Sequence, residues 1–261
     1  KDALTEKLGE GNVKFDEQNA SGDSANCTTI VSGFVSTGVD LILANATAPL
    51  QAAAQATADI PVLGTSVTDY ATALDISEWT GTVGNNISGT SDLAPLDQQA
   101  AMIQEMFPNA KTVGLLYCSA EPNSVYQCDV IEGYLTEMGL ETTRYAFTDT
   151  NDVTSVTQAA AAASDVIYIP TDNTAASNTE AIANVVIPEK VPVVAGEEGI
   201  CKGCGVAALS ISYYDLGYKT GEMAAEILAD GADVSTMPVA FARHWASPRR
   251  TAMRPLPTKK S

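Results

Sequence analysis

The stretch SDVIYIPTDNT (residues 164–174) runs from an apolar, strand-forming segment directly into small hydrogen-bonding side chains. VDLILANAT (39–47) follows the same plan much earlier in the chain. A second pair, IPVLGTSVTD (60–69) and VPVVAGEEG (191–199), recurs in the same order at nearly the same offset. Matched pairs at one offset indicate an internal repeat, and therefore two similar lobes.

Strand-like and helical patterns alternate along the whole chain. The expected strands cover residues 12–18, 39–44, 60–65, 111–117, 141–147, 165–170, 191–196 and 206–212. The expected helices cover residues 24–38, 96–107, 124–139 and 214–231, which end at a glycine or just before a proline. This alternation predicts an α/β protein with two Rossmann-like lobes, each built on a parallel sheet.

The repeat also predicts the division of the chain. We expect the first lobe to contain residues 1–88 and 208–233, and the second lobe to contain residues 89–207 and 234–242. The glycine-rich stretch 81–90 is interpreted as a connection between the lobes. The second lobe opens with a strand, whereas the first lobe opens inside the corresponding helix, so we expect the first strand of the first lobe to be missing from this sequence.

The charge distribution sets residues 243–261 apart from the rest. They hold six of the 14 basic residues and no acid, so the remaining chain carries 32 acidic against 8 basic residues. Such an acidic body repels nucleic acid phosphates and anionic lipid, and we expect no nucleic-acid partner. We interpret residues 243–261 as a disordered tail, with a basic interaction tail as the alternative.

The motifs of common catalytic and cofactor sites are missing from the sequence. The single histidine, His244, lies in the basic tail, and no G-x-G-x-x-G or Walker loop follows a strand. CKGCG (201–205) has C-x-x-C spacing, but its glycines favour a loop with a disulfide or two free thiols over a redox or zinc site. We therefore expect no catalytic residue, no metal and no cofactor.

Polar side chains gather where the predicted strands end, which is the edge at which open parallel sheets bind ligands. Helix N-termini at this edge would hold a carboxylate, and acidic side chains would hold an ammonium group. The predicted ligand-binding residues are Asn45, Thr47, Ser66, Thr68 and Asp69 in the first lobe, and Ser119, Glu121, Asn123, Ser124, Thr171, Asp172, Asn173 and Glu198 in the second. Most are ordinary helix-capping residue types, so local capping is the alternative interpretation.

Six motifs in order resemble the ABC transporter substrate-binding proteins of the tryptophan/tyrosine-binding type. They are ANATAPLQA (44–52), TSVTDY (65–70), GNNISGTSDLAPLDQQAAMI (84–103), LLYCSAEPNS (115–124), YIPTDNTAAS (168–177) and LSISYYDLGYKTGEMAAEIL (209–228). The resemblance covers roughly residues 1–240. It implies the type I periplasmic-binding-protein fold and an extracytoplasmic protein, usually a lipoprotein in Gram-positive bacteria, that delivers an amino acid to a membrane permease.

The expected function is capture of a free amino acid, often aromatic, by closure of the two lobes of a monomer. The carboxylate would meet N–H groups and hydroxyls near Thr47 and Ser66–Thr68, and the ammonium would meet Asp172 or Glu198. The resemblance places an aspartate at the position of Glu198. Two alternatives are an amino-acid racemase or hydrolase that uses Cys118 or Glu197, and the ligand-sensing domain of a regulator.

Overall fold

The computed structural model describes residues 1–241, which form two compact units. Within the described residues, the first unit comprises 1–93 and 211–241, and the second unit comprises Ala94–Ser210. None of the helices in the described part of the chain is both long enough and apolar enough to span a membrane.

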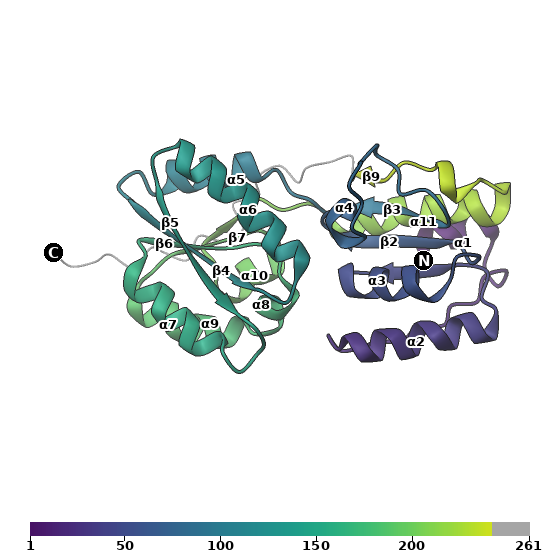
Figure 1. Ribbon diagram of the computed structural model, residues 1–261, viewed down its shortest axis with the longest axis horizontal. Helices are drawn as coiled ribbons and strands as arrows, with labels where there is room; N and C mark the ends of the chain where they lie inside the picture. The colour runs from purple at the N-terminus through teal and green to yellow at the C-terminus, as the bar shows by residue number, and fades with distance from the viewer. Residues whose placement is uncertain (242–261) are drawn as a thin grey trace. The chain divides into compact units, whose positions relative to one another are not determined.

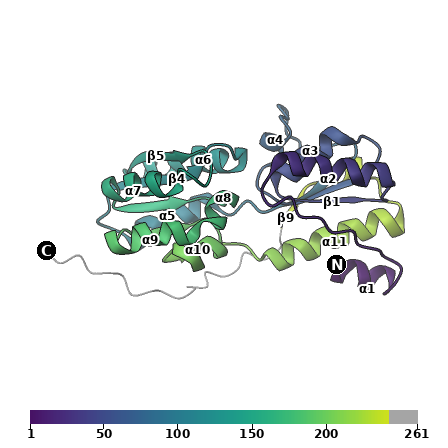
Figure 2. The same cartoon turned by 90° about the horizontal axis from the view of Figure 1, so that it is seen from below.

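The first unit is built on a parallel sheet with strand order β1-β2-β3-β9. Its strands are β1 (Ile42–Asn45), β2 (Val62–Val67), β3 (Ile87–Ser91) and β9 (Ala240–Phe241). Its helices are α1 (Asp2–Leu8), α2 (Ser24–Thr37), α3 (Thr47–Ala56), α4 (Tyr70–Ala73) and α11 (Tyr213–Asp230), with a short 3-10 helix at Val234–Thr236. Helix α3 lies on one face of the sheet with α2 packed beside it, while α11 lies on the other face and packs against α1 (Figure 2).

The second unit is built on a parallel sheet with strand order β5-β4-β6-β7-β8. Its strands are β4 (Thr112–Cys118), β5 (Glu141–Phe147), β6 (Val166–Ile169), β7 (Val193–Ala195) and β8 (Ala207–Ala208). Its helices are α5 (Leu96–Met106), α6 (Pro122–Glu137), α7 (Val153–Ala163), α8 (Asn173–Ser177), α9 (Thr179–Glu189) and α10 (Glu198–Cys204).

Both faces of the second sheet are buried, which explains why its central strands are apolar throughout. Figure 1 shows α5 and α6 on one side of this sheet and α7 and α9 on the other. Leu116 and Ile167 pack toward the α7–α9 side, whereas Leu115 and Tyr168 pack toward the α5–α6 side. Adjacent residues thus serve opposite core clusters, as the alternating geometry of a strand requires.

The core of the first unit contains more polar groups. Thr220 on α11 lies 2.8 Å from the Thr90 hydroxyl and donates to the Thr65 hydroxyl at 3.1 Å, and all three side chains are buried. These bonds tie α11 to β2 and β3. Because each hydroxyl has a partner, the cluster can be buried without the large cost of an unsatisfied polar group.

The two parallel sheets confirm the predicted fold class. The predicted helix ends are also confirmed, since α2 and α11 stop at Gly38 and Gly231, each in the left-handed conformation. Within the described residues, however, the segment 12–18 forms no strand, and 206–212 contains only the two-residue β8.

Three further assignments differ from the sequence expectations. The stretch 81–90, interpreted as a connection between lobes, leads into β3 inside the first sheet. CKGCG was expected to be a loop, but Cys201 and Cys204 lie in α10, and the five cysteines of the described chain form no disulfide. Residues 234–241, which were expected in the second lobe, belong to the first unit because β9 pairs with β3. The predicted tail, 243–261, lies outside the described residues.

Candidate functional site

The carboxyl edge of the second sheet opens between β4 and β6. These strands pair only from Val113 to Leu115 on β4, and β4 then continues alongside β5 as far as Cys118. Asp172 bridges the opening, since it accepts from the Cys118 N–H and from the Ala175 N–H, both at 2.7 Å. The Asp172 side chain therefore replaces a ladder hydrogen bond and also caps α8.

Glu121 gathers the residues that follow β6. Its carboxylate accepts from the backbone and side-chain amides of Asn173 and from the backbone N–H and hydroxyl of Thr174, at 2.8–3.0 Å. Asn123 donates to the Glu121 carboxylate at 3.3 Å and to the Thr171 carbonyl at 3.1 Å. The structure thus brings Glu121, Asn123, Thr171 and Asn173 into one hydrogen-bonded cluster.

The Glu121–Asp172 pair concentrates negative charge in this cluster. Asp172 is only 1% exposed. Burial first, and then the neighbouring charge of Glu121, raise the pKa of Asp172 to about 6, while the N–H groups of Ala175 and Cys118 oppose the shift. Asp172 was predicted to receive an ammonium group, but here both of its oxygens hold the protein's own backbone.

The other predicted residues of the second unit are arranged more simply. Ser124 is fully buried and accepts from the Asn123 amide at 3.3 Å. Ser119 is exposed and donates to the Phe147 carbonyl at 3.2 Å. Glu198 opens α10 with an exposed side chain whose ion pair with Lys202, at 2.8 Å, is a weak surface contact. Of the predicted acidic side chains on this edge, Glu198 is therefore the one with the weakest contacts to the rest of the protein.

The first unit presents an uncapped helix at the corresponding edge. Helix α3 begins at Thr47, and no side chain within residues 1–241 caps its first turn. The preceding residue, Ala46, has φ 91° and ψ 168°, a conformation that is costly for any residue except glycine. The free N–H groups of this turn and the helix dipole favour an anion.

The remaining predicted residues of the first unit surround the end of β2. Ser66 has a left-handed φ of 53° at an irregularity between Gly64 and Val67. Thr68 is buried, and Asp69 caps α4 by accepting from the Thr72 N–H at 2.7 Å. Asn45 ends β1 in register with Thr65 and is exposed. Asp69 thus has a local capping role, whereas Ser66 holds the less common backbone conformation.

The residues on which the enzyme alternative depends have structural roles. Cys118 is buried, and burial raises the pKa of its thiol, which disfavours the reactive thiolate. Glu197 caps α10 by accepting from the backbone N–H groups of Gly199 and Ile200. Within the described residues, no group of three or more His, Cys, Asp or Glu side chains is arranged to hold a metal ion.

Comparison with known proteins places this geometry in a family. The family model for ABC transporter substrate binding proteins matches residues 1–247. The chain belongs to this family. Its resemblance to the tryptophan/tyrosine-binding type is confirmed by the relatives described next.

A tyrosine-binding protein of Clostridioides difficile (strain R20291) is 36% identical over 228 residues. The match covers 87% of this chain and 66% of that protein, so the chain spans just under two thirds of this relative's length. The family includes similar solved structures. An ABC domain from Streptococcus pneumoniae in complex with L-Trp has 32% identity and a TM-score of 0.86, covering 92% of this chain and 83% of that one.

A ligand-free, open substrate binding protein with adhesive properties from Clostridium difficile has 37% identity and a TM-score of 0.68. That similarity covers 92% of this chain and 82% of that chain. The sequence identities of these relatives, 32–37%, support the family assignment and not only a shared fold.

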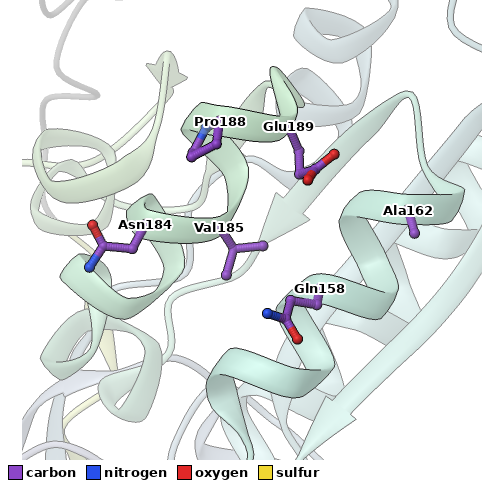
Figure 3. A pocket seen from close by; sticks show the side chains of 6 residues that line it. All are labelled: Gln158, Ala162, Asn184, Val185, Pro188 and Glu189. Atoms are coloured by element: carbon purple, nitrogen blue, oxygen red, sulfur yellow. The ribbon is translucent and has the colours of Figure 1, made fainter.

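A separate surface pocket of about 240 Å³ lies on the α7–α9 side of the second unit. Gln158 and Ala162 line it from α7, and Asn184, Val185, Pro188 and Glu189 line it from α9 (Figure 3). None of the predicted ligand-binding residues of this substrate-binding protein lines that pocket. The pocket is therefore distinct from the polar strand edge.

Sequence reasoning missed two buried glutamines that organise this edge. Gln99 on α5 donates to the carbonyls of Gly196 and Leu209 at 3.2 and 2.8 Å, and Tyr168 donates to Gln99 at 2.6 Å. Gln127 on α6 holds the backbone of Thr171. Each glutamine falls on the apolar face of its helix, a pattern visible in the sequence that signals an internal hydrogen-bonding role.

Proposed function

We propose that this protein is the solute-capturing component of an ABC importer and that it binds a free amino acid with an aromatic side chain. The observation that carries the proposal is the pair of polar strand edges, one ending in the uncapped α3 and the other in an acidic cluster. One edge suits a carboxylate and the other suits an ammonium group. The relatives named for tyrosine binding and for an L-Trp complex support an aromatic side chain.

In this proposal, the ligand carboxylate meets the first turn of α3. Thr47 contributes its N–H and hydroxyl, and Ser66 contributes its hydroxyl from the end of β2. The strained backbone at Ala46 supports this role, because such strain is concentrated at functional sites.

The ammonium group meets the second unit, and the structure favours Glu198 over Asp172 as its direct partner. Asp172 is buried with both oxygens engaged, whereas Glu198 is exposed and held only by Lys202. The half-buried Glu121 and the buried Asp172 add negative potential to this edge. In this proposal, the other predicted residues hold the loops of the two edges in place through hydrogen bonds and helix caps.

The family role supports the remaining parts of the proposal. The protein works outside the cytoplasm as a monomer, is anchored as a lipoprotein in a Gram-positive bacterium, and passes its ligand to a membrane permease after the lobes close. It performs no covalent chemistry on the ligand.

Calorimetry with each of the twenty amino acids tests this function. We expect L-tryptophan or L-tyrosine to bind, and Glu198→Gln to weaken binding about tenfold or more because a charge-assisted hydrogen bond is lost. Glu180→Gln is the matched control, since Glu180 also lies in the first turn of a helix of the second unit but is not among the residues assigned to the ligand.

Thr47→Val tests the proposed contact with the ligand carboxylate, and we expect it to weaken amino-acid binding about tenfold. Binding of a sugar or nucleoside with no response to any amino acid would overturn the ligand class. Conversion of the amino acid during prolonged incubation would overturn the assignment as a binding protein.

A further inference from the structure

Gln127 places a buried side-chain amide beside the loop that follows β6. Its Oε1 accepts from the Thr171 N–H at 3.0 Å, and its Nε2 donates to the Thr171 carbonyl at 3.0 Å. Nε2 also donates to the Asn123 carbonyl at 3.0 Å. The amide therefore satisfies both backbone groups of Thr171, as a neighbouring strand would.

Thr171 needs such a partner because it lies beyond the β-ladder. The pairing of β6 with β4 ends at Tyr168, and its pairing with β7 ends at Ile169. Partly buried N–H and C=O groups that leave a sheet must find other hydrogen bonds. Gln127 supplies them at the point where the strands separate.

Gly196 restricts the opposite side of the same loop. A Cβ atom at Gly196 would lie 2.7 Å from the Thr171 nitrogen and 2.8 Å from the Pro170 carbonyl carbon. The Gly196 backbone also donates to the Ile169 carbonyl at 2.7 Å. The peptide of Thr171 is thus confined between a buried amide and a closely packed backbone.

We infer that Gln127 is a positioning residue for ligand binding, which sets the loop 171–174 without touching the ligand itself. Thr171 leads directly into Asp172, which clamps Cys118, and into Asn173, which binds Glu121. A displaced Thr171 would shift both acidic contacts and the negative edge that they form. This inference rests on the proposed amino-acid binding.

Gln127→Leu removes all three hydrogen bonds of the amide and puts an apolar side chain of similar size in its place. We expect the Kd for L-tryptophan to rise about tenfold or more at a temperature where the variant is fully folded. Thr157→Val is the matched control, because Thr157 is equally buried in α7 and bonds only its own helix, to the Val153 carbonyl at 2.6 Å. This control should lower thermal stability without changing the Kd.

Gln127→Glu gives a readout that simple packing would not produce. At pH 7.5 the carboxylate would be repelled by the carbonyl oxygens of Thr171 and Asn123. It would also add a negative charge near Asp172 and Glu121. The Cys128 thiol is the adjacent titratable group on α6. At pH 5 a protonated glutamic acid can accept from the Thr171 N–H and make one of the two hydrogen bonds that the glutamine amide donates. We expect binding relative to wild type to be about tenfold weaker at pH 7.5 and to recover to within about threefold at pH 5.

Hydrogen exchange of the ligand-free protein separates this inference from the proposed function. Gln127→Leu should speed exchange at residues 171–175 at least severalfold, whereas Thr157→Val should not. Unchanged exchange there, or an equal loss of binding by Gln127→Glu at both pH values, would overturn the positioning role. If wild type binds no amino acid while exchange responds as expected, the proposed function fails and the structural role of Gln127 stands.

Discussion

In the second unit, β6 lies between β4 and β7, whereas its repeat counterpart β1 pairs only with β2 among the described residues. The helices differ in the same way. Helix α7 packs on α9, β4 and β5, while its counterpart α2 packs mainly on α3. The segment 12–18 corresponds to β5 but forms no strand. The matched elements of the first unit thus have fewer sheet neighbours among the described residues than their counterparts in the second unit.

This contrast shows that strand formation is decided by pairing rather than by residue preference alone. Strand β5 is largely exposed, yet it forms because every residue from Glu141 to Phe147 pairs with β4. Residues 12–18 (NVKFDEQ) hold fewer β-branched and aromatic residues, and they have no such ladder among the described residues. Strand formation here thus follows pairing together with residue preference.

The largest predicted effect concerns the close packing of β3 against β2 and Tyr70 in the first unit. A Cβ atom at Gly89 would lie 2.1 Å from the Gly64 carbonyl oxygen and 2.3 Å from the Tyr70 hydroxyl, at a φ of 147°. Gly89→Ala should therefore destabilise the first unit by about 3 kcal/mol or more. Hydrogen exchange followed by mass spectrometry should show the loss in β1–β3 and not in β4–β7.

Gly133→Ala is the opposite control for that substitution. Gly133 lies exposed within α6, and an added Cβ would meet no atom within 4 Å. Alanine there should stabilise the second unit by about 0.5–1 kcal/mol. Equal behaviour of the two variants would contradict the difference in packing between the positions of Gly89 and Gly133.

A second, smaller effect is a pH dependence confined to the second unit. Because the pKa of Asp172 is raised to about 6 in the folded state, the native protein binds this proton more tightly than the unfolded chain does. The contribution of Asp172 to stability should therefore fall as pH rises from about 4 to about 6.

Asp172→Asn removes this titration, although it also costs one backbone hydrogen bond at every pH. The stability difference between wild type and variant, followed by hydrogen exchange in the second unit from pH 5 to pH 7, should shift in favour of the variant as pH rises. A constant difference across this range would show that Asp172 does not titrate there.

The smallest expected change in stability comes from the open edge of the first sheet. Leu43 on β1 is 56% exposed, and among residues 1–241 β1 pairs on one side only; such an apolar strand edge favours association with other chains. Leu43→Lys should reduce self-association in sedimentation measurements at high concentration while changing the unfolding free energy by less than about 0.5 kcal/mol. Leu228→Lys on α11, also at an exposed leucine, should leave self-association unchanged.

Much of the local structure was accessible from residue patterns. Gly38 and Gly231 marked helix ends correctly, and the apolar runs at 165–170 and 191–196 became β6 and β7. The polar residues after these strands were also predicted to gather at one edge, and in the second unit Glu121, Asn123, Thr171, Asp172 and Asn173 do so. The strand–helix alternation carries this information because parallel strands end at the same edge.

The roles within that cluster could not be predicted in the same way. Asp172 looked like a ligand contact, but the separation of β4 from β6 leaves the Cys118 N–H to be satisfied, and Asp172 satisfies it. The sequence analysis assigned Gln127 no role, although it supports Thr171. Which polar group faces a ligand and which serves the backbone depends on where the ladder ends.

By itself, the sequence determined the alternation of elements, the repeat, the helix ends and the family, because these follow from local periodicity and from the order of motifs. Only the tertiary structure decided that residues 12–18 stay irregular, that β9 joins the first sheet, and that Asp172 turns inward. The physical reason is that hydrogen bonds between distant segments must be completed wherever backbone is buried, and the partners that complete them are fixed by packing.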